Sequence, residues 1–479
     1  MNTLILQFKK VTPLCLTVFA LALLPSGHAV SPPPDGVYPN FTTAEGQSAL
    51  QSLTTGVANT GLGAFALFDT TTGSNNTAVG AGALDLNNGE SNTAVGTAAL
   101  LLNTSGTENT ATGTAALENN STGDFNDAVG AFALFSNTTG EDNTAVGDRA
   151  LQNNTTGSRH TAVGSGALQK CIAPPDFAGN TAVGTHALLN DTTGNFNTAI
   201  GDAALVSNTI GAVNTAIGLD ALVSNTEGNT NTAVGGNALF NNTTGDDNTA
   251  VGIFALFSNE TGNTNTAVGK DALNLSTAGS LNTAVGNAAL IFNSGDGNTA
   301  LGAGAGTSVA TADNVICIGN PGADVSNTTW IGNVFGVTTQ SGTTAPVIVS
   351  NAGQLGTVAS SERFKKDIAT MEKASEAILA FRPVTFHYKT DTKGAPQFGL
   401  IAEEVAKVNP ALVLPDKEGK PYTVRYDAVN VMLLNEFLKE HRKIEQLEKQ
   451  VEKLTEGLQR VSAQLELSKA EPRTVLNNH

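Results

Sequence analysis

Charged residues, aromatic residues and cysteines are all scarce in this chain of 479 residues. Charged residues make up 14% of the sequence, aromatic residues make up 5%, and there are three cysteines. This is not the composition of an ordinary globular enzyme, and it excludes a disulfide-rich scaffold. Because spacing alone cannot define a disulfide pair, we interpret Cys171 and Cys317 as buried free thiols.

Basic residues are nearly absent before residue 360. Residues 30–359 contain four Lys and Arg against 24 Asp and Glu, whereas residues 360–479 contain 19 against 18. Phosphate binding needs clustered Lys and Arg, so this balance excludes nucleic acid as a partner of the first region. We expect no cofactor or metal, since acidic pairs such as Glu141 and Asp142 are interpreted as solubilising turns rather than binding Ca²⁺.

Long apolar runs are also missing, apart from one near the N-terminus. Lys9 and Lys10 precede an apolar run over residues 11–24, and a small-x-small sequence ends at Ala29. This pattern predicts a signal peptide over residues 1–29, and the run is too short to span a bilayer comfortably. We therefore expect a secreted or cell-surface protein with no membrane-spanning segment in the mature chain.

The abundant residues Gly, Asn, Thr and Ala form a repeat, mostly of 17 residues. Each copy reads Asn-Thr-Ala-Val-Gly, two residues, Ala-Leu, and a turn rich in Asn, Thr and Gly. The period is too short for helical-hairpin repeats, whereas a brief β run followed by Gly suits stacked coils. The fold expected is mainly β: a parallel β-solenoid, or β-roll, over residues 59–335, after a lead-in over 30–58 and before a linker over 336–359. The copies begin at Asn59, Asn76, Asn92, Asn109, Asn126, Asn143, His160, Asn180, Asn197, Asn214, Asn231, Asn248, Asn265, Asn282 and Asn298.

These repeats resemble the head repeats of trimeric bacterial adhesins and the shafts of phage tail fibres. The resemblance implies a homotrimer in which three chains pack along the rod, and we expect the Ala face of each strand to permit that packing. It does not identify a ligand, which could be a surface glycan or a protein. We interpret the Asn ladders as satisfying backbone groups between coils, with a binding face as the alternative.

The composition changes after residue 356, where the 17-residue period ends. Residues 360–440 are predicted to form a small α+β domain, followed by a coiled coil over 441–468 and a flexible tail over 469–479. The coiled coil rests on an unbroken 3-4 spacing of apolar residues. The alternative is one amphipathic helix that packs on its own domain. The apolar series is Ile444, Leu447, Val451, Leu454, Leu458, Val461 and Leu465.

The chemistry-bearing motif is Ala359-Ser360-Ser361-Glu362-Arg363-Phe364-Lys365-Lys366-Asp367-Ile368. It resembles the start of the S74 peptidase family, the intramolecular chaperone domains of phage tailspikes. Further blocks are Arg382-Pro383-Val384-Thr385-Phe386, residues 398–405, Asn409-Pro410 and Tyr426. The resemblance implies that Ser360 and Lys365 form a self-cleaving dyad that cuts between Ala359 and Ser360.

Two features of the motif leave alternatives open. The family commonly has Asp and then a basic residue after the nucleophile, where this chain has Ser361 and Glu362. The shifted pair Ser361 and Lys366 is therefore a rival dyad, and either serine could instead cap a helix.

We therefore expect an exported trimeric fibre or adhesin-like protein whose C-terminal domain guides assembly and acts once on its own chain as a serine endopeptidase. The alternative is an uncleaved surface-binding or adhesion protein that retains this domain as a trimerisation stalk.

Overall fold

A computed structural model describes residues 39–172, 179–340, 342–350 and 352–469. The chain divides into two compact units, residues 1–338 and 339–479, which are described separately below. The predicted signal peptide (residues 1–29) lies outside the described residues, as does the predicted tail beyond residue 469. Among the described helices, none combines the length and the apolar character needed to cross a membrane.

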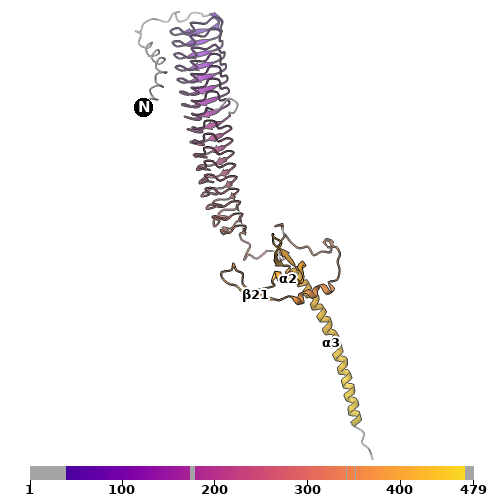
Figure 1. Cartoon of the computed structure of the whole chain (residues 1–479). Helices are drawn as coiled ribbons and strands as arrows, with labels where there is room; N and C mark the ends of the chain where they lie inside the picture. Colours follow the sequence, from indigo (N-terminus) through magenta and orange to yellow (C-terminus); the bar gives the residue numbers. More distant parts are fainter. Residues whose placement is uncertain (1–38, 173–178, 341, 351, 470–479) are drawn as a thin grey trace, which may run out of the picture. The chain divides into compact units, whose positions relative to one another are not determined.

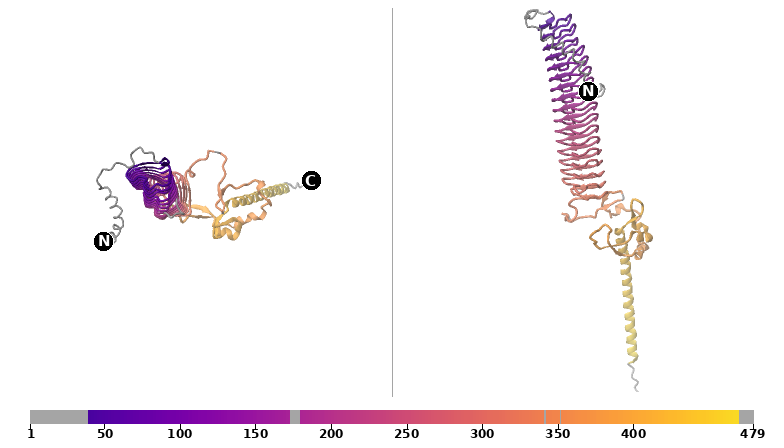
Figure 2. Two further views of the ribbon diagram at one scale, coloured as in Figure 1. Left: turned by 90° about the horizontal axis from the view of Figure 1, so that it is seen from above. Right: turned by 60° about the vertical axis from the view of Figure 1, so that its left-hand side comes forward.

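The first unit is a parallel β-solenoid of 17-residue coils, which confirms the predicted architecture (Figures 1 and 2). A short 3-10 turn, η1 (Pro39–Phe41), precedes it. β1 (Thr43–Glu45) already pairs with β2, so stacking starts one coil before the Asn59 at which the repeat was placed. Seventeen strands follow it: β2 (Thr60–Leu62), β3 (Thr77–Val79), β4 (Thr93–Val95), β5 (Thr110–Thr112), β6 (Asp127–Val129), β7 (Thr144–Val146), β8 (Thr161–Val163), β9 (Thr181–Val183), β10 (Thr198–Ile200), β11 (Thr215–Ile217), β12 (Thr232–Val234), β13 (Thr249–Val251), β14 (Thr266–Val268), β15 (Thr283–Val285), β16 (Thr299–Leu301), β17 (Ile316–Ile318) and β18 (Thr329–Ile331).

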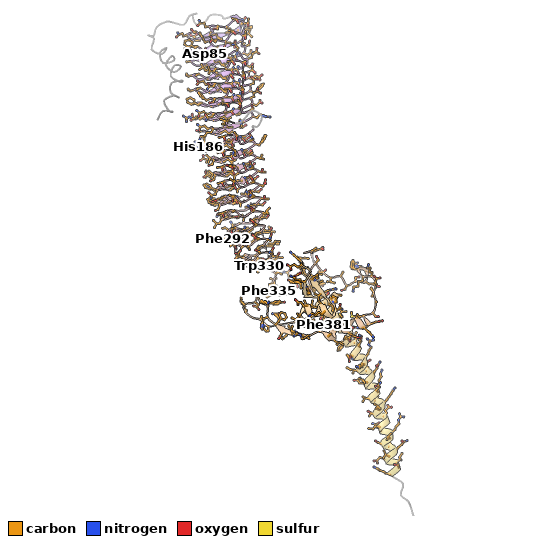
Figure 3. All side chains as sticks on the ribbon, in the orientation of Figure 1. Asp85, His186, Phe292, Trp330, Phe335 and Phe381 are labelled. Carbon is orange, nitrogen blue, oxygen red and sulfur yellow. The ribbon has the colours of Figure 1, made fainter. Side chains whose placement is uncertain are left out.

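The strands stack in register, so each repeat position forms a ladder. In β10 and β11, for example, Ala199 pairs with Ala216. The middle Ala of each repeat points inward and is buried, because alternate residues of a strand face opposite sides. The expectation that an Ala face packs against other chains is therefore wrong. The outward positions carry Thr and Val or Ile, and Figure 3 shows turn side chains such as His186 and Phe292 along the outside.

A second Ala and a Leu complete the core of each coil. Ala204 and Leu205 are fully buried, as are their counterparts in most coils. Leu205 adopts a left-handed backbone with φ of 52°, which costs about 1–2 kcal/mol for an L-residue. Burying the Leu side chain contributes about 1.5–3 kcal/mol, enough to offset that cost. Gly after the strand is a steric requirement, because a Cβ on Gly147 would lie 2.5 Å from the carbonyl oxygen of Gly164.

Two buried amide ladders run through the coils. In the first amide ladder, formed by the leading Asn of each repeat, the side-chain oxygen of Asn197 accepts the backbone N–H of Asn214 (3.0 Å). In the second amide ladder, eleven residues later, Asn225 donates to Asn208 (2.9 Å). Asn214 and Asn225 both donate to the carbonyl oxygen of Gly228. The structural interpretation of the Asn ladders is thus confirmed, since these side chains satisfy buried backbone groups.

A carboxylate closes the C-terminal end of the stack. In most coils, N–H groups of the turn after the second ladder donate to one carbonyl oxygen of the next coil. In the last full coil, Asp324 Oδ1 takes that place and accepts the N–H groups of Ala310, Thr311 and Ala312 at 2.7–2.9 Å. These bonds, led by that of Thr311, lower the pKa of Asp324 to about 2.

The second unit has a small α+β core. Val405, Leu412, Val424 and Met432 are its buried apolar residues. The segment from Glu372 to Ala380 is a 3-10 helix, and the long helix starts at Tyr426. The elements are β19 (Ile348–Val349), β20 (Leu355–Gly356), η2 (Glu362–Phe364), η3 (Glu372–Ala380), β21 (Val384–Phe386), β22 (Gln397–Gly399), α2 (Ala402–Val408), η4 (Pro410–Leu412), β23 (Val413–Pro415), β24 (Pro421–Val424) and α3 (Tyr426–Lys469). The strands pair antiparallel as β19–β20, β21–β22 and β23–β24.

Candidate functional site in the C-terminal unit

Ser360 and Lys365 flank the single turn η2, on a segment that is exposed throughout. Ser360 follows an extended stretch after β20, and Lys365 ends η2 with its backbone N–H donating to the Glu362 carbonyl (2.9 Å). The structure records no hydrogen bond between the two side chains. A lysine acts as a base only where burial or a neighbouring cation favours its neutral amine. In the single chain, Ser360 and Lys365 lie beside the same turn, but neither residue is buried.

The neighbours of this pair bear on the alternatives. Ser361 occupies the N-terminal position of η2, but its side chain makes no capping hydrogen bond. The guanidinium of Arg363 lies over the ring of Phe364, with its central carbon 4.6 Å from the ring centroid. Phe364 is 64% exposed, as is Ile368. The segment thus has apolar side chains beside the serine and lysine that nothing in the described chain covers.

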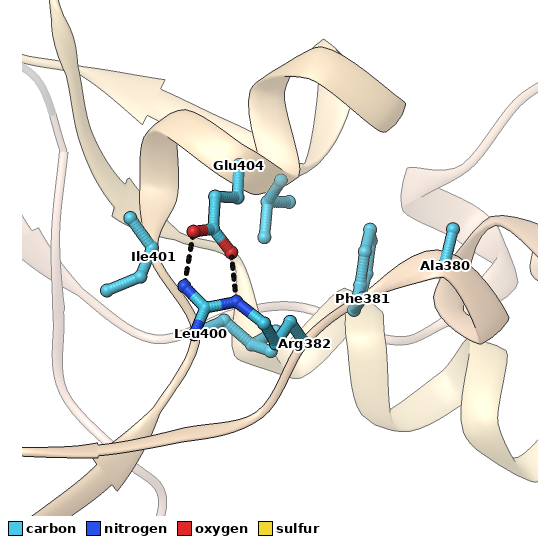
Figure 4. Close-up of a pocket in the computed structure, with 7 residues that line it drawn as sticks. Ala380, Phe381, Arg382, Leu400, Ile401 and Glu404 are labelled. Atoms are coloured by element: carbon cyan, nitrogen blue, oxygen red, sulfur yellow. Dashed lines mark hydrogen bonds and ion pairs between the residues drawn. The ribbon is translucent and has the colours of Figure 1, made fainter.

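An ion pair fixes two of the sequence blocks against each other. Arg382 lies just before β21, and Glu404 lies in the first turn of α2 (Figure 4). Arg382 Nε donates to Glu404 Oε2 (3.2 Å), and Nη2 donates to Oε1 (2.5 Å). The hydrogen bonds from Arg382 lower the pKa of Glu404. Phe381, Leu400, Ile401 and Val405 line the small pocket around the pair, so this geometry holds β21 and α2 together and leaves little room for a ligand.

Tyr426 connects the long helix to the same region. Its hydroxyl oxygen accepts the backbone N–H of Leu400 (2.9 Å), between β22 and α2. The neighbouring Arg425 donates its backbone N–H to the carbonyl oxygen of Leu412 (2.8 Å). The first residues of α3 are therefore anchored in the domain core, which gives the Tyr426 position of the motif a structural role.

A buried polar network around Ser375 could not be predicted from the sequence. Ser375, in η3, is fully buried; its hydroxyl donates to Glu436 Oε1 (2.5 Å) and accepts from Asn435 Nδ2 (2.7 Å). Lys439 Nζ lies 3.3 Å from the same hydroxyl and 2.6 Å from Glu436. Hydrogen bonds from Lys439 and then Ser375 lower the pKa of Glu436. Because Ser375 lies 60 or more residues from the other members, no local motif marks this network, which joins η3 to α3.

The distal part of α3 carries the predicted coiled-coil seam. The seven seam residues, from Ile444 to Leu465, are 50–72% exposed. Upstream on the same helix, Leu433, Leu434 and Phe437 are also more than half exposed. In the single chain, this apolar seam lies uncovered along one helix, as the apolar positions of coiled-coil helices do before they pair.

Within the described ranges, no group of three or more His, Cys, Asp or Glu side chains is placed to hold a metal ion. No curated protein and no solved structure matches the chain significantly. The comparison that succeeds is with a protein family. Residues 360–414 match the sequence model of the S74 peptidases, described as chaperone of endosialidase, so the segment that contains Ser360, Lys365, Arg382 and Glu404 is a domain of that family.

Proposed function

We propose that this chain is an exported, trimeric fibre protein whose C-terminal domain guides assembly and then cuts itself off between Ala359 and Ser360. The observation that carries the proposal is the apolar seam of α3, which is exposed in the single chain although its 3-4 spacing is unbroken. Burying such a seam between helices contributes about 1.5–3 kcal/mol per Leu, so association of the helices is strongly favoured. Export rests on the basic and apolar pattern of residues 1–29.

The outer strand face of the rod supports association of the same kind. Val146, Val163 and Ile200 lie in one outward ladder and are each 37–39% exposed. The outward strand positions are mostly Thr, Val, Ile and Leu, and Glu45 and Asp127 are the charged exceptions. Since the rest of the rod is acidic, electrostatic repulsion between copies of the chain is weakest along this face.

The repetitive sequence of the rod cannot by itself set the register between chains. Identical coils can pair out of register by a whole repeat at little cost, so three rods need a register mark outside the repeat. A trimerising domain at the end of the rod supplies that mark. Its removal afterwards leaves a rod that cannot readily reassemble and is therefore kinetically trapped.

The cut is an acyl shift followed by hydrolysis. Lys365 Nζ takes the proton from Ser360 Oγ, which attacks the carbonyl carbon of Ala359. The C–N bond breaks, the proton passes to the leaving nitrogen of Ser360, and Ala359 remains as an ester on the hydroxyl oxygen. Water then hydrolyses the ester, giving a carboxylate at Ala359 and a free Ser360 at the new N-terminus. Assembly would supply the cover over Phe364 and Ile368 that the lysine needs.

The test is the mass of the secreted product. A denaturing gel with intact-mass measurement should show two fragments, and N-terminal sequencing of the smaller should begin at Ser360. Light scattering on the secreted protein should give the mass of three chains. A fragment that starts elsewhere would exclude this cut, and a monomer would exclude the fibre architecture.

The second candidate is an uncleaved surface-binding or adhesion protein that keeps its C-terminal domain as a stalk. The observation that favours it is the lack of any hydrogen bond between Ser360 and Lys365 in the described chain. In that case the gel shows one band at the full mature mass, while light scattering still gives a trimer.

A further inference from the structure

At one place in the rod, both amide ladders contain residues other than Asn. The leading position of one coil holds His160 instead of Asn, and the second-ladder position of the same coil holds Cys171. In the next coil the second-ladder position holds Asp191. All three side chains are fully buried. The ladder is broken there, because the side-chain oxygen of Asn154, one coil earlier, is buried without a hydrogen-bond partner.

The imidazole of His160 can make the hydrogen bonds of the ladder Asn only in its neutral form. Its backbone N–H donates to Asn143 Oδ1 (3.0 Å), as the ladder requires, and its Nδ1 accepts the backbone N–H of Asn180 (3.3 Å). Since a backbone N–H must donate, Nδ1 carries no proton, and the neutral ring carries its proton on Nε2, 3.7 Å from Cys171 Sγ. A second ring proton would place two donors face to face at Asn180.

Asp191 places a carboxyl group at the buried Asn position, and burial favours its protonated form. Its Oδ1 accepts from Asn208 (2.7 Å), and its Oδ2 accepts from Asn180 (3.1 Å). Ionised, it would be a buried charge among neutral amides. The titratable groups in this part of the ladders are His160, Cys171 and Asp191, while the nearby charged side chains Arg159 and Lys170 are exposed. No described cation is placed to compensate a carboxylate there.

We propose that His160, Cys171 and Asp191 form a protonation-dependent seam between two adjacent coils of the rod, closed while the imidazole is neutral and the carboxyl is protonated. Burial supports both states: it lowers the pKa of His160 to about 4 and raises that of Asp191 to about 8, against the hydrogen bonds from Asn208 and Gly194. The two neutral forms coexist between these values.

The seam should open with a characteristic pH profile. Opening returns the two groups to water, where they titrate at 6.5 and 3.8. Between pH 4 and 6.5 opening binds a proton at His160, and between pH 3.8 and 8 it releases one from Asp191. Below pH 6.5 proton uptake by His160 and proton release by Asp191 cancel, so the equilibrium constant for opening does not change with pH there. It then rises about tenfold per pH unit, or about 30-fold in all, up to pH 8.

Cys171 provides the measurement. The whole secreted protein is labelled with a maleimide at pH 4.5–8.5, and peptide mass spectrometry gives the rates at Cys171 and Cys317. Each rate is divided by that of the double variant His160→Asn/Asp191→Asn at the same pH, which cancels the intrinsic reactivity of the thiol. Cys317, buried in another coil, is the internal control and should give a ratio near one at every pH.

The single variants separate the two groups. Asp191→Asn should show opening that increases about tenfold per unit as pH falls from 6.5 towards 4, and His160→Asn should show opening that rises from pH 4 to 8. Asp191→Ser is the second choice if Asp191→Asn misfolds, since Ser276 occupies the same ladder position. Ratios independent of pH in the wild type and both single variants would overturn the proposal.

Discussion

The rod and the C-terminal unit bury their apolar residues in opposite ways. In the rod, each coil places Ala and Leu inside its own chain, and a continuous core runs through the stack. In the C-terminal unit, four apolar residues are buried, while Phe364, Phe398, Leu454 and other large side chains are 64–80% exposed. In the proposed assembly, other copies of the chain would cover these exposed side chains, which would suit the C-terminal unit to align chains.

The largest effect should come from replacing Ser360, the proposed nucleophile, because this change should abolish the cut and leave assembly intact. Ser360→Ala should fold and form trimers yet remain whole, and Lys365→Ala should do the same because the hydroxyl loses its base. Intact-mass spectrometry of the secreted protein measures the outcome. Ser361→Ala is the matched control and should be cut as in the wild type. Cleavage that persists in Ser360→Ala would favour the shifted pair Ser361 and Lys366.

The next largest effect should come from the seam of α3, on which the contrast between the two units depends. Replacing Leu454 and Leu458 with Asn removes two buried leucines from each helix of the assembly, at about 1.5–3 kcal/mol each. Light scattering should then show little soluble trimer, and the uncut fraction should increase. Leu467→Asn is the control, because Leu467 is also exposed (72%) but lies outside the 3-4 series. Unchanged assembly would mean that the helix packs within its own domain.

A core substitution in the rod should affect stability without affecting the cut. Leu222→Ala leaves a cavity in a fully buried position and should lower the free energy of unfolding of the rod by about 2–5 kcal/mol. Leu219→Ala, at a position that is 54% exposed, should change it by less than about 0.5 kcal/mol. Urea unfolding measures both variants. A loss of cleavage in Leu222→Ala would show that the two units fold as one, which would contradict their separate description.

The smallest effect concerns the end of the stack. The pKa of Asp324 is about 2 in the folded rod and 3.8 in the unfolded chain, so its stabilising effect is complete above pH 3.8 and is lost as pH falls towards 2. Because Asp324 is exposed, screening should limit the change in melting temperature to about 2–4 °C. Thermal melts at pH 2–5 should show a steeper fall of the melting temperature with falling pH in the wild type than in Asp324→Asn. Equal slopes would mean that the cap does not contribute to stability.

Local repetition was enough to predict the rod. The 17-residue period, the Gly after each strand and the buried leading Asn follow from steric limits and hydrogen-bond needs that recur in every coil. The direction of the Ala residues did not follow, because alternation along three residues divides them into two faces without saying which is inside. The left-handed Leu was equally hidden, since its backbone is imposed by the closure of the coil and opposes the residue's own preference.

The candidate site was predictable to a smaller extent. Ser360 and Lys365 could be named from the motif, and they do lie on either side of one turn. Ser375, Glu436 and Lys439 could not, because their contact depends on how η3 meets α3 across some 60 residues of chain. The proposed cover over Ser360 and Lys365 would come from contacts between chains, which no single sequence pattern specifies.

The in-register stacking of the coils also has a consequence for how such a rod can change over generations. Since Thr meets Thr and Ala meets Ala in successive strands, a coil that is duplicated or deleted leaves every remaining rung with the same neighbours. The rod can therefore be lengthened or shortened in whole steps of about 4.8 Å, while a change of a few residues disturbs the ladders. The length of the rod is thus set by the number of coils, independently of the sequence of the C-terminal unit.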